Sequence, residues 1–248
     1  MKYKEYGNKN APTIILLHGG GLSWWNYRET AELLKHDYHI ILPIIDGHAG
    51  SDRRFTSIEK NAKEIISFIN THLNGSVLMI GGLSLGGQIL LEMLSQKNDI
   101  CQYALIESAM AIPSKLTNVM IRPVFGISYP LIKQKWFSKL QFRQLRIKPE
   151  LFDDYYCTSC QISKEDLIAF LKANTLYAVK KSLRKCTANV LIYYGQKEMA
   201  GIKKSAQIIH RMLPNSRLIE LPKLYHGEFS INHPEAYVKV IRCFKRKE

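Results

Sequence analysis

The feature that most constrains the fold is a regular alternation of two kinds of segment along the chain. Six short runs are apolar and rich in β-branched residues, as in Thr13–Leu17 (TIILL) and Val190–Tyr194 (VLIYY). The other four are His39–Leu42, Val77–Ile80, Tyr103–Ile106 and Arg217–Leu221. Short runs that are apolar almost throughout are typical of strands buried on both faces of a mostly parallel sheet. We therefore expect six such strands.

Longer segments with the apolar spacing of helices separate these runs. They are Trp24–Leu34, Ser57–Leu73, Leu85–Ser95, Ile202–Leu213 and Pro234–Cys243. Strands that alternate with helices favour parallel neighbours joined by helical crossovers, because each helix returns the chain to the same edge of the sheet. The sequence therefore predicts an α/β fold with a doubly wound, mostly parallel sheet.

The alternation breaks once, between residues 111 and 187. This segment contains no clean strand, and Pro113, Pro123, Pro130 and Pro149 divide it into short pieces. It is predicted to be a helical insertion between two strands. The expected organisation is thus a core formed by residues 1–110 and 188–248, and an insertion formed by residues 111–187.

The charge of the chain is uneven. The 248 residues include 35 Lys and Arg against 21 Asp and Glu, a net charge of +14. The insertion holds 14 of these basic residues and 5 of the acidic ones, and no acidic residue occurs from Ser108 to Pro149. Such a surplus allows contact with nucleic acid, anionic lipid or acidic ligands. No zinc finger, RNA-recognition signature or basic helix-turn-helix is present, so we expect no nucleic-acid partner.

One part of the insertion has the pattern of a basic amphipathic helix. Ile132, Trp136 and Leu140 recur every four residues, and the residues between them include Lys133, Lys135, Lys139 and Arg143. A helix of this kind can lie on an anionic membrane surface. The interpretation that we favour is that its apolar face packs on the core while its lysines are solvated.

Targeting and metal-binding signals are weak. The polar start MKYKEYGNKNAP leads directly into a strand-like run, and no apolar run approaches the length of about 20 residues that crosses a bilayer. We therefore expect a cytoplasmic protein. Cys157 and Cys160 form a single C-x-x-C without a second pair, so no metal site is expected.

A serine between two glycines is the strongest chemical motif. Gly82-Leu83-Ser84-Leu85-Gly86 follows the run Val77–Ile80 directly and opens the segment Leu85–Ser95. A sharp turn from strand to helix exposes the serine hydroxyl beside the free N–H groups of the helix start, and it requires small neighbours. Upstream, His18-Gly19-Gly20-Gly21 ends another strand, and glycines there let backbone N–H groups face a pocket that binds a developing oxyanion.

Together with an acid after the next-to-last strand and a histidine after the last, these motifs resemble the α/β-hydrolase superfamily over nearly the whole chain. The resemblance implies a nucleophile, an acid and a base in that chain order. Ser84 matches the nucleophile, Glu198 in Gly195-Gln196-Lys197-Glu198 matches the acid, and His226 in Leu224-Tyr225-His226-Gly227 matches the base. The backbone N–H groups of Gly20 and Leu85 would form the oxyanion hole.

Two assignments have competitors. Most members of the superfamily have Asp at the position of Glu198, and Glu107 at the end of Tyr103–Ile106 is the alternative acid, since some members place it one strand earlier. Of the eight histidines, His226 alone follows the last strand and precedes the final helix start at His233-Pro234. Asp46–Ser51 resembles the family's D-x-x-G-x-S loop, for which a structural role is expected, and His48 within it is not taken as catalytic.

The resemblance implies a serine hydrolase that cleaves a carboxylic ester or a related acyl compound through an acyl-enzyme, without metal or cofactor. The insertion lies where the superfamily carries its cap or lid, which usually sets specificity. The alternatives are the same fold acting on another bond (thioester, amide, lactone or carbon–carbon), a membrane-associated lipase, or a non-catalytic ligand-binding member, because fold does not decide function. The sequence identifies neither the substrate-binding residues nor the oligomeric state.

Overall fold

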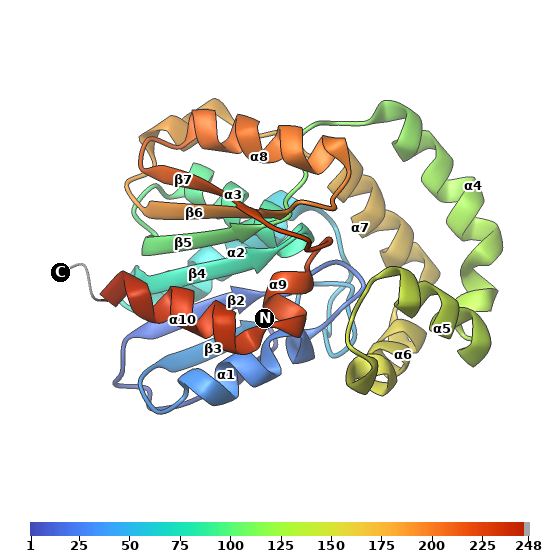
Figure 1. Cartoon of the computed structure of the whole chain (residues 1–248), viewed down its shortest axis with the longest axis horizontal. Coiled ribbons are helices and arrows are strands. Elements are labelled where there is room, and N and C mark those ends of the chain that lie inside the picture. Colours follow the sequence, from blue (N-terminus) through green and yellow to red (C-terminus); the bar gives the residue numbers. More distant parts are fainter. Residues whose placement is uncertain (246–248) are drawn as a thin grey trace.

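A seven-stranded sheet forms the centre of the molecule, as seen in a computed structural model that describes residues 1–245 (Figure 1). The strand order is β1-β3-β2-β4-β5-β6-β7, and only the pairing of β1 with β3 is antiparallel. The strands are β1 Tyr3–Tyr6, β2 Thr13–Leu17, β3 His39–Pro43, β4 Val77–Leu83, β5 Cys101–Glu107, β6 Asn189–Gly195 and β7 Ser216–Leu221.

The six predicted strands are confirmed, and the edge strand β1 was missed. β1 reads YKEY, and its four residues are exposed or half-buried. The apolar signal that identifies a buried strand is therefore absent from it. Tyr6 pairs with Ile40 and Tyr3 with Pro43, so β1 protects the edge of β3 by backbone pairing rather than by apolar burial.

Helices cover both faces of the sheet and bury alternate residues of each strand. On one face α2 Ile58–His72, α3 Leu85–Gln96 and α8 Ala200–Met212 contribute to the apolar cluster that contains Ile15 and Leu17. On the other face α1 Arg28–Leu34 and α10 Pro234–Lys245 contribute to the cluster that contains Ile14 and Leu16. The remaining core elements are the 3-10 helix η1 Trp24–Tyr27 and the short α9 Glu228–Asn232. The two-faced burial explains why the central strands are apolar throughout.

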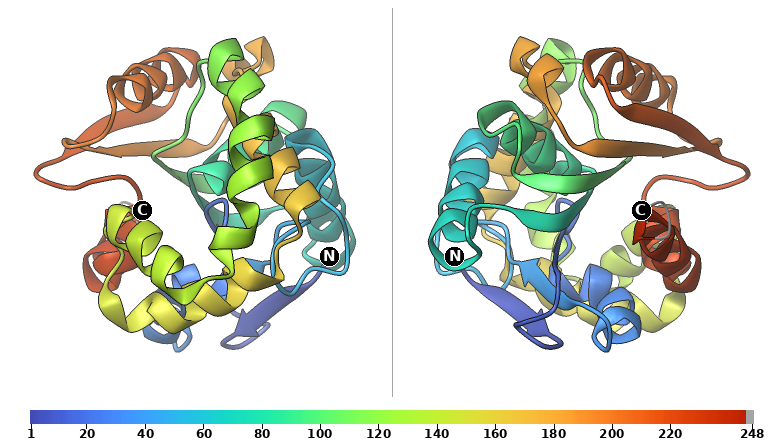
Figure 2. Two further views of the ribbon diagram at one scale, coloured as in Figure 1. Left: turned by 90° about the vertical axis from the view of Figure 1, so that its right-hand side faces the viewer. Right: turned by 90° about the vertical axis from the view of Figure 1, so that its left-hand side faces the viewer.

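Between β5 and β6 the chain leaves the sheet and forms a group of helices at one end of it (Figures 1 and 2). These are α4 Lys115–Ile132, α5 Lys135–Gln144, η2 Pro149–Leu151, α6 Phe152–Gln161, α7 Lys164–Leu176 and η3 Lys181–Lys185. Ser114 and Ser163 cap the N-termini of α4 and α7, where their side chains accept the N–H of Thr117 and Asp166. The division into a core and an insertion of residues 111–187 stays a prediction.

The expectation that Ile132, Trp136 and Leu140 pack on the core is wrong for two of these three residues. Ile132 is buried, but Trp136 is 60% exposed and Leu140 is 51% exposed. The reason is that α5 packs mainly against the neighbouring helices α4 and α6, so only one side of the stretch is covered by other elements. Among residues 1–245, no helix is long and apolar enough to cross a membrane.

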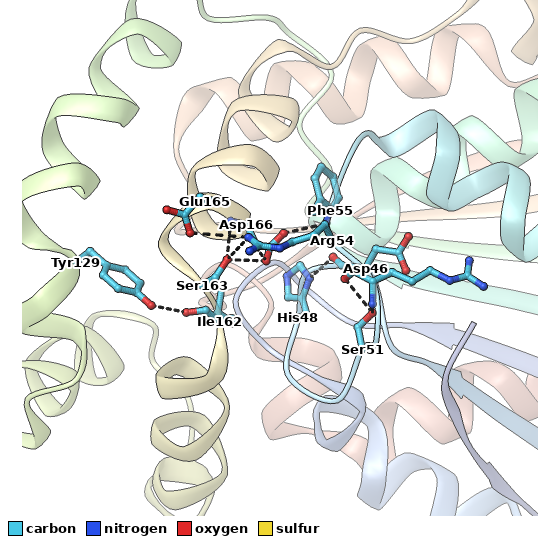
Figure 3. Close-up of polar contacts among 11 residues, drawn as sticks. Asp46, His48, Ser51, Arg54, Phe55, Tyr129, Ile162, Ser163, Glu165 and Asp166 are labelled. Carbon is cyan, nitrogen blue, oxygen red and sulfur yellow. Dashed lines mark hydrogen bonds and ion pairs between the residues drawn. The ribbon is translucent and has the colours of Figure 1, made fainter.

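Helix α7 is fastened to the core by the loop of residues 46–55 (Figure 3). Asp166 lies in the first turn of α7 and accepts the backbone N–H of Phe55 at 2.9 Å and the hydroxyl of Ser163 at 2.6 Å. Arg54 lies 3.4 Å from the same carboxylate. Gly47 has a positive φ of 73°, and a Cβ there would lie 2.7 Å from the Cβ of Phe55, so this turn requires glycine.

Candidate active site

Ser84 sits on a strained turn between β4 and α3. Its φ of 51° and ψ of −109° are unusual for a residue with a side chain. The turn is held because the N–H of Ser84 donates to the carbonyl of Glu107 at 2.8 Å. A Cβ at Gly82 would lie 2.4 Å from the Gly86 oxygen, and one at Gly86 would lie 2.2 Å from the Leu17 oxygen. These contacts are the physical reason for the G-x-S-x-G spacing.

Gly20 and Leu85, predicted as oxyanion-hole residues, lie side by side. Leu85 is the first residue of α3, so its N–H has no partner within the helix. The turn with Gly20 is held on both sides, since Gly19 N donates to Asn26 Oδ1 and Gly21 N donates to His48 Nε2. A Cβ built on Gly20 would lie 3.5 Å from the Leu85 side chain.

Two buried histidines support this turn. His18 Nε2 accepts the N–H of Ile45 at 3.1 Å and His48 Nε2 accepts that of Gly21 at 3.1 Å, so each ring carries its proton on Nδ1, which faces a backbone carbonyl. Burial lowers the pKa of His18 to about 3, helped by the neighbouring His48, and burial lowers the pKa of His48 to about 4. Both rings are thus neutral structural acceptors and not acid–base groups.

Glu198 and His226 form a hydrogen-bonded pair. His226 Nδ1 lies 2.9 Å from Glu198 Oε2, and Ser108 Oγ and Gly195 N each donate to Glu198 Oε1 at 2.7 Å. Burial alone would raise the pKa of Glu198, but the hydrogen bonds from these three groups and the His226 charge outweigh it, and the pKa is lowered. An ionised Glu198 can only accept, so Nδ1 of His226 carries a proton, and in the neutral form of the ring the lone pair is on Nε2.

Glu107, the alternative acid, lies elsewhere. It is 1% exposed, and its Oε1 accepts the N–H of Ser230 in α9 at 3.3 Å. Among the described residues, its Oε2 has no hydrogen-bond partner. Burial, against the opposing effect of Ser230, raises the pKa of Glu107 to about 7. The structure therefore brings Glu198, and not Glu107, onto the ring of His226.

A cavity of about 250 Å³ opens over these residues. Ser84 and His226 both line it, together with Gly20 and Gly227. The rest of its wall is mostly apolar and comes largely from the inserted helices: Phe125, Tyr129, Ile132, Leu145, Ile147, Tyr155, Ile162, Leu167, Phe170 and Leu171. His48 stacks on Phe170 with ring centroids 4.5 Å apart, which joins the glycine turn to the insertion.

A second cavity, of about 360 Å³, meets the first at Ser84 and His226. Its wall is more polar and includes Gln144, Asn174 and Lys197. Ser84 is therefore bordered on one side by apolar and on the other by mixed surface. Among residues 1–245, no group of three or more His, Cys, Asp or Glu is arranged to hold a metal ion.

Sequence reasoning missed some supporting residues. Ser108 holds Glu198, Asn26 holds the glycine turn, and Asn174 of α7 exchanges hydrogen bonds with Gln88 of α3. None of these residues stands in a motif. The single local signal is at Ser108, which stands two residues after the predicted strand Tyr103–Ile106, and its positive φ of 56° appears only in three dimensions.

Comparison with known proteins places the chain in a family. The model of the alpha/beta hydrolase fold family matches residues 12–230. The uncharacterized hydrolase YugF of Bacillus subtilis is 24% identical over 241 residues, which cover 90% of this chain and 86% of YugF. Epoxide hydrolase 3 of Xenopus tropicalis is 23% identical over 68% of this chain and 49% of its own length. The chain thus belongs to the alpha/beta hydrolase fold family and is a hydrolase of that fold.

Solved structures show the same fold. An esterase from Thermogutta terrifontis superposes with a TM-score of 0.80 at 18% identity, covering 99% of this chain and 93% of that one. An enol-lactonase from Burkholderia xenovorans superposes with a TM-score of 0.81 at 16% identity, covering 99% and 96%. MenH from S. aureus superposes with a TM-score of 0.78 at 17% identity, covering 99% of this chain and 98% of that one.

Proposed function

We propose that this protein is a serine hydrolase that cleaves a carboxylic ester or a related acyl compound, with Ser84, His226 and Glu198 as its catalytic residues. The observation that carries the proposal is the Glu198–His226 hydrogen bond at a cavity that Ser84 also lines. The names of two structural neighbours, an esterase and an enol-lactonase, agree with a carbonyl substrate.

The reaction follows from the protonation states. His226 Nε2 takes the proton of Ser84 as its Oγ attacks the substrate carbonyl, and Glu198 holds the ring and stabilises its cation. The N–H groups of Gly20 and Leu85 bind the oxyanion, and one such donor is typically worth about 3–4 kcal/mol. The leaving group departs with the proton from His226. Water then attacks the acyl-enzyme with His226 as the base.

The two cavities suggest how the substrate is divided at Ser84. The apolar cavity of about 250 Å³ suits the acyl part, and the more polar one suits the leaving group. Most of the apolar wall comes from residues 111–187, so we infer that this insertion acts as a lid that sets specificity and excludes water.

Labelling with a fluorophosphonate, mapped by peptide mass, tests the proposal. Wild type should be labelled at Ser84, and labelling should be lost in Ser84→Ala and His226→Ala. Glu198→Ala should label far more slowly, whereas Glu107→Ala, if folded by circular dichroism, should label like wild type. p-Nitrophenyl esters of graded chain length then measure the depth of the apolar cavity. A folded wild type that is neither labelled nor active on these esters would contradict the proposal.

A further inference from the structure

Helix α4 is apolar on two opposite faces. Its inner face includes Ile121, Phe125 and Ile132, spaced by four and seven residues, and the last two line the cavity over Ser84. Its outer stripe includes Leu116 and Ile127, and the helical period places these about half a turn away from the inner residues. A helix that covers a cavity needs only the first face. The second requires a separate explanation.

The outer stripe is exposed to an unusual degree for large apolar side chains. Ile127 is 82% exposed, Leu116 is 80% exposed and Val119 is 70% exposed. Of the large apolar residues that are exposed in the described part of the chain, most belong to the insertion: Leu116, Val119, Met120, Val124, Ile127, Leu131, Trp136, Leu140, Leu145 and Leu176. Concentrated exposure of this kind marks an interaction surface, unlike single scattered residues.

Helix α4 forms the outer border of the molecule. It runs along the side farthest from α10 in Figure 1, and it faces the viewer in the left view of Figure 2. Its neighbours are α7 and α5, which lie on its inner side. Within residues 1–245, Leu116, Val119 and Ile127 of the outer stripe are at least 70% exposed, so a flat partner can reach them without rearrangement of the fold.

The charged residues of α4 and α5 are all basic. Neither α4 nor α5 contains an acidic residue, and both carry basic ones: Lys115, Arg122, Lys135, Lys139 and Arg143, with Lys133 between the helices. Within residues 1–245, Lys135 is the one member of this group with an ion pair, at 3.8 Å from Asp153. The other basic side chains are left to neutralise an external anion.

We propose that the outer face of α4, together with Trp136 at the start of α5, docks on the surface of an anionic lipid bilayer. Apolar side chains inserted at the level of the head groups, lysines and arginines around them, and an interfacial tryptophan are the features by which a helix lies on such a surface. A second copy of this chain is a poorer occupant, because two equally basic surfaces would face each other.

This orientation has a consequence for the cavity. The inner face of α4 lines the space over Ser84 while the outer face would rest on lipid, so a single helix separates the membrane surface from the cavity. Acyl compounds that partition into bilayers would then be concentrated beside the lid. The binding itself does not depend on the proposed catalytic role of Ser84.

Vesicle flotation of the full-length Ser84→Ala protein tests the docking separately from catalysis. The probes are vesicles of phosphatidylcholine with and without phosphatidylglycerol. We expect flotation with the anionic vesicles, a strong decrease at 0.5 M salt, which screens charges beyond about 5 Å, and little flotation with the neutral ones. Absence of flotation with anionic vesicles at low salt, or equal flotation with both, would overturn the proposal.

Matched variants locate the surface. Leu116→Gln with Ile127→Gln, and separately Lys115→Gln with Arg122→Gln, should each lower the partition coefficient at least about tenfold. The controls are Leu33→Gln, an exposed leucine on α1, and Lys63→Gln with Arg211→Gln, which removes two charges from α2 and α8. Equal losses in variants and controls would refute the assignment to α4.

A third measurement addresses the alternative occupant. Analytical ultracentrifugation of wild type without lipid should show no dimer that the Leu116→Gln, Ile127→Gln variant dissociates. If such a dimer exists, a second copy covers the stripe and the lipid proposal is wrong. Fluorophosphonate labelling of Ser84 in the same variant should match wild type, so failure of docking and failure of the catalytic proposal give different results.

Discussion

The Ser84 end of the sheet and the insertion above it are built in opposite ways. At the sheet, polar atoms are placed one by one: Glu198 accepts three hydrogen bonds, and the glycine turn is held by His48 and Asn26. In the insertion, the cavity wall is mostly apolar, and α4 packs mainly against α7 and α5. Directional contacts fix positions within tenths of an ångström, whereas apolar packing tolerates exchange of one side chain for another.

The difference indicates that the Ser84 end of the sheet and the insertion have separate roles. Chemistry that depends on a lone pair or a proton needs side chains held by directional hydrogen bonds. Selection of a substrate or of a surface needs only apolar packing. Helix α7 stands between them, because Asp166 and Asn174 bind it to the core while Phe170 faces the cavity. Substitutions at the Ser84 end of the sheet, in α7 and in the rest of the insertion should therefore have effects that differ in kind as well as in size.

The largest contrast is expected between His226 and the outer face of α4. His226→Ala should lower kcat/KM by at least about a thousandfold, because the general base is lost. The melting temperature should fall only slightly, because the buried Glu198 loses one of its three hydrogen bonds and keeps those from Ser108 and Gly195. Ile127→Gln should change kcat/KM on a short water-soluble ester by no more than about twofold. Steady-state kinetics and thermal melts of both variants check this. A large loss of kcat/KM in Ile127→Gln would show that the outer face of α4 also contributes to the chemistry.

Glu107→Gln tests the buried carboxyl behind the site. The pKa of Glu107 is raised to about 7, so the folded state holds its proton more tightly than the unfolded state, and stability falls as pH rises from about 4.5 through 7. Glutamine stays neutral, so the variant should be more stable than wild type at pH 8 by on the order of 3 kcal/mol. The advantage should vanish near pH 4.

Urea unfolding of both proteins at pH 8 and at pH 4 measures this difference. Glu198 contributes in the opposite direction, since its lowered pKa gives stability that is lost as pH falls, but it is present in both proteins and its effect cancels. An advantage that is the same at both pH values would show that the substitution acts through packing and not through the proton.

Asp166→Ala tests the attachment of α7. It leaves the buried N–H of Phe55 without its acceptor and removes the partner of Ser163, so we expect a loss of about 2 kcal/mol in the free energy of unfolding. The neighbouring Glu165, which is largely exposed and lies 3.8 Å from Arg54, is the control. Glu165→Ala should cost less than about 0.5 kcal/mol. Equal costs in the two variants would argue against the anchor.

The smallest effect is expected from the strained backbone at Ser84. Its φ of 51° and ψ of −109° are the mirror image of a conformation that L residues favour, so glycine adopts them without strain. Ser84→Gly should therefore be more stable than Ser84→Ala by about 1 kcal/mol, although glycine loses more entropy on folding. Paired thermal unfolding curves decide this, and a more stable alanine variant would show that the turn is relaxed.

The sequence by itself determined the α/β class, the central strands and the turn at Ser84. These follow from short-range physics. A strand buried on both faces must be apolar throughout. The turn must have glycine at position 86, because a Cβ there would lie 2.2 Å from the Leu17 oxygen. It could not reveal β1, whose residues are mostly polar because an edge strand is held by backbone pairing alone.

The tertiary structure decided what depends on distance between remote residues. Glu107 ends β5, Glu198 follows β6, and both have the same chemistry. Only the folded chain shows that the ring of His226 meets Glu198, whereas Glu107 is buried and accepts the N–H of Ser230 in α9. In the same way, the apolar residues of α4 are alike in sequence. Which of them face the cavity and which face solvent is set by the position of α7, because a helix surface is buried only where another element lies against it.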